Sequence, residues 1–529
     1  MAGRRIAAAM LAAGLSAALP AMAQKSGGIL KMQHWDSPAS MSILEEATYS
    51  VVVPMGGVMS NLVVYNQHVA QNSLSDIVPD LADSWAWSED GRELTFKLHP
   101  GIKWHDGKPF TAADVKCTFD LLSGKGEAKL RVNPRKEWWQ NVAEVTTNGD
   151  FEAVFHLQRP QPALLTLLAS GYSPIYPCHV PPNEMRLHPI GTGPFKFVEF
   201  KPNEYIKVAR NPDYWKPGRP YLDGIEYDIV PNRSTAILGF IAGQFDMTWP
   251  YYVTPPLVRD IASQAPNATC VTATNNATIN LLLNRDKPPF DNPDLRKALA
   301  LTIDRKSFVD ILAEGSAKIG GAMLPPPEGL WGMPPEMLAT LPGYGPDVQK
   351  NRAAAREIMQ KLGYGPDKKL QLSVSTRNVP TFRDPAVILI DQLKEVYVDA
   401  VLDAVETANW FPKVTRKDYT VALNATGSGV DDPDQQFFEN YACGSQRNYS
   451  GYCNPELDKK FVEQSTMSDQ EARKKLVWDI DKKLQEDGAR PIIFHIVNAS
   501  CMQSSVKGLT IMVNSIYNGW KMEDVWLDR

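Results

Sequence analysis

The first 23 residues have the three parts of an export signal, which constrains the rest of the chain more than any other feature. Arg4 and Arg5 give a positive start, residues 6–19 are apolar, Pro20 ends the run, and Ala21-Met22-Ala23 forms a small-x-small cleavage site. The apolar run is shorter than the roughly 20 residues of a membrane-spanning helix, and no later window reaches that length. We therefore expect a soluble periplasmic protein, with a buried N-terminal helix as the lesser alternative.

Cleavage after Ala23 leaves roughly 500 residues, which is more than one hydrophobic core normally serves. Two or more lobes are expected. The whole chain has a formal net charge of −5, without long runs of like charge. Nucleic acid is therefore an improbable partner, since it selects basic surfaces.

Six cysteines in an exported chain favour disulfide bonds. Cys443 and Cys453 enclose a short polar loop, so we expect them to pair and to stabilise the fold by about 2 to 3 kcal/mol. Zinc is a weak alternative because no Cys-x-x-Cys or His-x-x-x-His spacing occurs, and no metal or cofactor is expected. Three pairings remain open for the other four cysteines, which are Cys117, Cys178, Cys270 and Cys501.

Segments with strand and helix patterns alternate along the chain, which predicts a mixed α/β architecture. Residues 94–98 and 151–157 alternate apolar and polar side chains as half-buried strands do. Helices are predicted where caps and apolar spacing coincide, at residues 111–122, 292–300, 353–362 and 471–485.

Short motifs spread over the whole chain carry a family resemblance. They are Val-Pro-Asp-Leu-Ala at 78–82, Gly-Ile-Lys-Trp-His-Asp-Gly-Lys-Pro-Phe at 101–110, Gly-Thr-Gly-Pro-Phe at 191–195, Arg-Asn-Pro-Asp-Tyr-Trp at 210–215, and Phe-Asp-Asn-Pro-Asp-Leu-Arg-Lys-Ala-Leu at 290–299. In sequence and order they resemble the family 5 extracellular solute-binding proteins of ABC importers. That class contains dipeptide-, oligopeptide- and nickel-binding members.

The resemblance implies a two-lobed periplasmic-binding-protein (Venus-flytrap) fold of the α/β class, in the large form with an extra subdomain. Lobe one would be residues 24–274, with the inserted subdomain at about 62–190, and would be completed by residues 491–529. Lobe two would be residues 275–490. Apolar strand-like runs at 279–284 and 491–495 would form the hinge, and ordinary buried strands are the alternative.

In peptide-binding members of the family, an aspartate after a lobe-two strand binds the α-ammonium of the ligand. In this chain that position falls on Gly429, and a tryptophan that some members have three residues earlier is Thr426. A buried ammonium without a charged partner is costly. Asp431 or Asp432 could substitute, although Asp-Asp-Pro-Asp is also a common turn composition.

Arg377 is the better candidate for a ligand contact. It aligns with an arginine that binds the ligand carboxylate in some dipeptide-binding relatives, where a guanidinium can donate two parallel hydrogen bonds. A surface salt bridge is the alternative. Apolar walls could come from five further candidates, for which core packing is the alternative: Trp410, Trp249, Tyr251, Trp35 and Met41.

The sequence contains no Gly-x-Ser-x-Gly or His-Glu-x-x-His motif, so no enzymatic activity is expected. The resemblance implies a monomeric receptor that captures a small, peptide-like solute and delivers it to an ABC permease driven by a cytoplasmic ATPase. Two alternatives stay open. One is an exported hydrolase, and the other is a receptor for a non-peptide ligand such as a sugar, a conjugate or a metal chelate.

Overall fold

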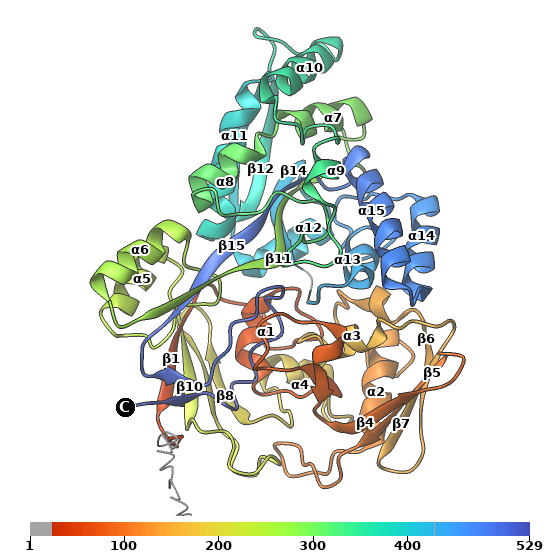
Figure 1. Ribbon diagram of the computed structural model, residues 1–529, viewed down its shortest axis with the longest axis vertical. Coiled ribbons are helices and arrows are strands. Elements are labelled where there is room, and N and C mark those ends of the chain that lie inside the picture. The colour runs from red at the N-terminus through yellow and green to blue at the C-terminus, as the bar shows by residue number, and fades with distance from the viewer. Residues whose placement is uncertain (1–23, 428) are drawn as a thin grey trace, which may run out of the picture.

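The computed structural model describes residues 24–427 and 429–529, so the predicted export signal at residues 1–23 lies outside the described part. The chain forms two halves, and two long strands run side by side from one to the other (Figure 1). Within the described ranges, no helix has both the length and the apolar character needed to cross a membrane.

The lower half in Figure 1 contains a four-stranded sheet with the order β1-β10-β9-β8. Its strands are β1 (Ile29–His34), β10 (Gly224–Ile229), β9 (Tyr205–Arg210) and β8 (Phe195–Lys201). β1 lies parallel to β10, and the other neighbours are antiparallel. β1 leads directly to Trp35 and Asp36, which places these two residues at the carboxyl end of the strand.

A second four-stranded sheet, antiparallel throughout, lies in the same half with the order β4-β5-β7-β6. Its strands are β4 (Ala82–Trp87), β5 (Glu93–Leu98), β7 (Glu152–Leu157) and β6 (Val142–Thr147), and helix α2 (Ala112–Ser123) packs against β6. β5, β7 and α2 occupy the segments for which the alternating pattern and the N-cap predicted strands and a helix. The spacing of apolar residues was sufficient to predict these three elements because each of them buries only one face.

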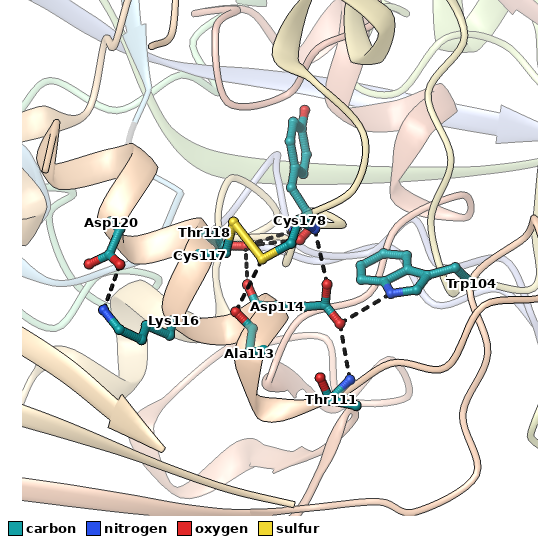
Figure 2. The surroundings of a disulfide bond; sticks show 10 residues. Trp104, Thr111, Ala113, Asp114, Lys116, Cys117, Thr118, Asp120 and Cys178 are labelled. Atoms are coloured by element: carbon teal, nitrogen blue, oxygen red, sulfur yellow. Dashed lines mark hydrogen bonds and ion pairs between the residues drawn. A yellow bond between two sulfur atoms is a disulfide. The ribbon is translucent and has the colours of Figure 1, made fainter. Parts of the chain in front are cut away.

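Asp114 closes the N-cap of α2 and connects the start of this helix to two other segments (Figure 2). Its carboxylate accepts hydrogen bonds from Thr111 N at 3.0 Å, Trp104 Nε1 at 3.3 Å and Cys178 N at 3.0 Å. The same helix carries Cys117, which is bonded to Cys178. The Trp104 motif is therefore scaffold, because its indole is buried and fixes the turn against the helix.

The upper half is built on a five-stranded sheet with the order β13-β12-β14-β11-β15. Its strands are β13 (Val398–Val405), β12 (Leu370–Arg377), β14 (Val421–Gly427), β11 (Thr269–Leu283) and β15 (Ile492–Met502). The antiparallel pair β11 and β15 continues into the lower half, where Cys270 is bonded to Cys501. The predicted two-lobed α/β fold is confirmed, whereas the residue numbers given for the lobe boundaries stay predictions.

The remaining elements connect and cover these sheets. In the lower half they are α1 (Tyr49–Gly56), β2 (Val63–Tyr65), η1 (Leu74–Asp76), β3 (Ile77–Pro79), η2 (Lys136–Trp139), α3 (Leu164–Ala169), α4 (Pro182–Leu187), α5 (Arg233–Ile241), α6 (Pro255–Gln264), β16 (Val506–Lys507) and β17 (Trp526–Leu527). In the upper half they are α7 (Pro293–Thr302), α8 (Arg305–Ala313), α9 (Pro335–Leu338), α10 (Val348–Lys361), α11 (Pro380–Lys394), α12 (Thr407–Thr415), α13 (Pro433–Asn440), α14 (Pro455–Thr466) and α15 (Gln470–Glu486).

All six cysteines are bonded within the described part of the chain. Cys443–Cys453 is the pairing that the short loop between them favours. Of the three arrangements open to the others, the structure has Cys117–Cys178 and Cys270–Cys501. The second of these joins residues 231 positions apart, a proximity that depends entirely on β11 pairing with β15.

Candidate ligand-binding site

A small cavity lies between the two halves and is lined by residues of both. Side chains of the lower half that line it include Trp35, Tyr49, Tyr251, Ile516 and Tyr517. Those of the upper half include Arg377, Thr381, Phe382, Phe411, Asn424, Ala425, Gly427 and Arg447, and the two long strands contribute Asn275, Ala277 and Ile496. A solute in this cavity would contact both halves at once.

Arg377 reaches from the upper half to the lower half. It is the last residue of β12, and its Nη2 is ion-paired with Asp36, which follows β1. Thr407, at the start of α12, joins them: its Oγ1 accepts from Arg377 Nε at 3.0 Å and donates to Asp36 Oδ2 at 2.6 Å. The ion pair is buried, with 5% and 7% of the two side chains exposed.

Three aromatic rings surround this guanidinium. Arg377 Cζ lies 4.5 Å from the centroid of Phe382, 5.1 Å from that of Trp35 and 5.8 Å from that of Phe411, in cation–π range. Asp36 Oδ1 is buried without a hydrogen-bond partner in the described chain. The pair thus has hydrogen-bonding capacity that the protein itself does not use.

Two of the predicted aromatic candidates of the lower half, Trp35 and Trp249, stack on each other. Trp35 lies parallel to Trp249, with centroids 6.1 Å apart, and contacts Tyr49 at 4.7 Å. Trp35 and Tyr251 line the cavity, whereas Trp249 lies behind Trp35 and supports it. The hydroxyl of Tyr251 donates to backbone oxygens of residues 512 and 515, so this side chain presents its ring to the cavity.

The other apolar candidates lie in the core. Met41 is fully buried in the main hydrophobic cluster, and Trp410 packs with Leu282, Val414 and Tyr419 inside the upper half. Neither side chain lines the cavity between the halves. Their proposed ligand contacts stay untested predictions, and core packing accounts for both positions.

Gly429 is part of the contact between the halves. Its carbonyl oxygen accepts from Ser515 Oγ at 3.0 Å and from Asn518 Nδ2 at 2.6 Å, both from the lower half. A Cβ at this position would overlap Ser170 Oγ, so an aspartate would displace this hydroxyl. Thr426 is not among the lining residues, and its Oγ1 accepts from Arg490 Nη1 at 2.8 Å.

Asp431 and Asp432, the two aspartates that follow, do not line the cavity. Asp432 caps α13 and accepts two hydrogen bonds from Arg473, at 2.9 and 2.8 Å. Asp431 accepts from Leu330 N at 2.8 Å, and burial raises its pKa to about 7. The turn interpretation therefore describes the geometry of both, and a role in binding stays untested.

Arg447 is a cavity residue that sequence reasoning missed. It lies in the loop closed by Cys443–Cys453 and is ion-paired with Glu439 of α13. Glu439 also accepts from Trp138 Nε1 of the lower half at 2.9 Å. Burial opposes the charge of Arg447, but Glu439 outweighs this effect and keeps the pKa of the guanidinium above its ordinary value.

Asp36 was missed as well, although it directly follows the candidate Trp35. Its signal was an acidic residue at the end of a predicted strand, a position where parallel strands present side chains at a sheet edge. For Arg447, the available signal was a cation in a disulfide-closed loop. Among the described residues, no three His, Cys, Asp or Glu side chains are grouped as metal ligands.

Two lobes with a cavity lined from both sides form the architecture of a solute-binding protein. The profile of bacterial extracellular solute-binding proteins, family 5 Middle, matches residues 76–448, well over half of the chain. The chain belongs to this family. Family members are extracellular or periplasmic binding proteins rather than enzymes, and they bind peptides or other small solutes for import.

Individual relatives agree with this assignment. The oligopeptide-binding protein AppA of Bacillus subtilis is 26% identical over 452 residues, which cover 81% of this chain and 80% of that protein. A solved structure of Haemophilus influenzae OppA in complex with RPPGFSPFR has a TM-score of 0.83 at 20% identity, covering 96% of this chain and 99% of that one. The structure of AgaA from A. tumefaciens R10 in complex with agropinic acid has a TM-score of 0.80 at 21% identity, covering 95% and 99%.

Proposed function

We propose that this chain captures a small solute in the cavity between its two lobes and presents the closed form to an ABC permease in the inner membrane. It acts in the periplasm as a monomer after cleavage of the export signal, and it catalyses no reaction. The observation that carries the proposal is the cavity itself, whose walls come from both halves around the Arg377–Asp36 pair.

Lobe closure is a population shift in this proposal. A solute that touches both walls binds the closed form better than the open form, and that difference in affinity drives closure. The long strands β11 and β15 are the connections that would bend, because they cross between the halves as one antiparallel pair. The lobe boundaries at residues 274–275 and 490–491 follow from the same proposal.

Relatives support a peptide-like solute and also a non-peptide alternative. The name of the Bacillus subtilis relative specifies oligopeptides, and that of an Escherichia coli relative, 25% identical over 520 residues, specifies glutathione. The complex of AgaA with agropinic acid shows that a fold of this kind also holds another class of solute.

The test is to purify the protein gently from the periplasm, to measure its mass under native conditions, and then to denature it and identify any released solute. A stoichiometric small molecule that rebinds to the stripped protein supports the proposal. Turnover of peptides or glycosides by the purified protein would instead support the exported hydrolase. Failure to release or rebind any solute would count against a receptor.

A further inference from the structure

The charges that face the cavity have one sign. Arg377 and Arg447 are the charged side chains that line it, and no carboxylate is among the described lining residues. The acids nearest to these arginines are already engaged, Asp36 with Arg377 and Glu439 with Arg447. A cationic group that entered the cavity would therefore meet two guanidinium groups, and the acids nearest to them are ion-paired, with Asp36 Oδ1 as the carboxylate oxygen left without a hydrogen bond in the described chain.

Two more buried arginines, Arg135 and Arg490, lie next to residues that line the cavity. Arg135 is 3% exposed, its Nη1 donates to the carbonyl oxygen of Glu46 at 2.9 Å, and its Nε and Nη2 have no hydrogen-bond partner in the described chain. Its Cζ lies 3.2 Å from the centroid of Tyr172, which in turn packs against the cavity residue Tyr517. The cavity wall is thus backed by a buried guanidinium that forms no ion pair within the described residues.

Arg490 has the same character. Its guanidinium is 1% exposed and donates only to neutral oxygens, which are Thr426 Oγ1 at 2.8 Å, Asn440 Oδ1 at 3.0 Å and the carbonyl of Arg447 at 3.0 Å. The carboxylate of Glu46, whose backbone oxygen accepts from Arg135, lies 3.6 Å from Arg131 Nη2 and accepts from Ser40 Oγ at 2.7 Å. Arg490 is thus a second buried guanidinium without an ion pair among the described residues, in contact with the cavity residue Arg447.

The rest of the lining is flat and apolar, with a few neutral polar groups. Trp35, Phe382 and Phe411 supply rings, and Asn275 and Asn424 supply amide groups. Rings of this kind enclose an apolar or aromatic body, whereas amide groups can hydrogen-bond a neutral amide or hydroxyl. A buried ammonium would need a carboxylate that the described lining does not offer.

We propose that the solute is an organic anion without a free ammonium: a carboxylate on a ring-sized apolar body, as in an N-blocked amino acid or dipeptide or an aromatic carboxylic acid. The proposal rests on the proposed function and specifies its ligand. The carboxylate would be bound between the lining guanidinium groups, where each can donate a charge-assisted hydrogen bond.

A matched set of probes tests this directly on the stripped wild-type protein. The set consists of Phe-Leu, N-acetyl-Phe-Leu and N-acetyl-Phe-Leu amide, which differ only in their end groups. Titration calorimetry at pH 7.5 should show the acetylated acid binding about tenfold or more tighter than either of the others. Equal or tighter binding of free Phe-Leu, or of the amide, would overturn the proposal.

A charge placed in the cavity gives a second measurement. Asn424→Asp keeps the shape of the side chain and adds a negative charge to the lining, so binding of the acetylated acid should fall by about tenfold or more. Asn409→Asp makes the same change on an exposed position of α12 and should leave the affinity unchanged. Equal affinities of the two variants, with both folded by circular dichroism, would contradict an anion site.

The solute released from the native protein separates this proposal from the proposed function. It should gain mass on esterification and resist an amine-labelling reagent. A released solute that carries a primary amine would leave the receptor function standing and overturn the anion proposal. If no solute is released and none of the three probes binds, the receptor function itself fails, and the anion proposal fails with it.

Discussion

At the scale of residues, the interaction that organises the cavity is the pair formed by Arg377 and Asp36. The two residues lie 341 positions apart and belong to different halves. Thr407 and the rings of Trp35 and Phe382 hold the guanidinium in place, so its direction is fixed before a solute arrives. Preorganisation of this kind lowers the entropic cost of binding.

Arg377→Ala should weaken solute binding by about 2 kcal/mol or more, because it removes a donor to the solute and leaves Asp36 buried without its partner. Titration calorimetry with the released solute measures the change. Arg383→Ala is the matched control, since Arg383 lies six residues further on, is 41% exposed and lines a different surface groove. Equal affinities of the two variants would remove Arg377 from the site.

Asp431 makes stability depend on pH. Burial raises its folded pKa to about 7, so the folded state binds a proton that the unfolded state releases near pH 4. Stability is therefore lost as pH rises from about 4 to about 7, by at most roughly 1.4 kcal/mol per pH unit.

Asp431→Asn should stabilise the protein at pH 8 relative to wild type, with a much smaller gain at pH 5, because the amide has no proton to lose. Urea unfolding at the two pH values measures the difference. The exposed Asp399→Asn provides the control and should show no such dependence. A gain that is equal at both pH values would show that the Asp431 carboxyl does not titrate in this range.

At the scale of elements, the strand pair β11–β15 connects the halves, and a disulfide closes it at one end. Removing Cys270–Cys501 by a double serine substitution should cost about 5 kcal/mol on the chain-entropy model, because the bond closes a loop of 231 residues. Removing Cys443–Cys453, which closes 10 residues, should cost about 2 to 3 kcal/mol. Urea unfolding compares the stabilities of the two variants. A larger loss of stability on removing Cys443–Cys453 would contradict loop closure as the main source of the stabilisation.

At the scale of the whole molecule, function depends on how closely the two halves meet. Gly429 lies where the upper half contacts Ser170, Ser515 and Asn518 of the lower half. Scattering in solution should show a smaller radius of gyration with solute than without it, since closure brings the halves together.

Gly429→Asp should reduce this compaction and weaken binding by about tenfold, because its side chain would overlap Ser170 in the closed form and place a charge in a buried contact. Gly365→Asp, at a glycine with open space around it and no left-handed backbone conformation, serves as a control for the added charge. A Gly429→Asp variant that closes fully and binds free Phe-Leu tightly would show that the position can accept an ammonium partner.

Much of the fold could be predicted because its signals are local. The Thr111–Asp114 cap marks the start of α2, and the alternation in 94–98 and 151–157 reports burial of one face within a few residues. The site was less predictable. Arg377, Trp35 and Tyr251 do line the cavity, but Trp410 and Met41 lie in the core, and aromatic residues in the core and in a cavity wall have the same sequence pattern.

The sequence by itself determined the family, the α/β class and the Cys443–Cys453 pairing, because ordered motifs, periodicity and short loops act over short distances along the chain. Only the tertiary structure decided that Arg377 meets Asp36, that Cys270 meets Cys501, and that Arg447 faces the cavity. These contacts depend on which strand ends and loops the sheets bring together. That arrangement is a property of the packed chain, since no local pattern specifies a partner hundreds of residues away.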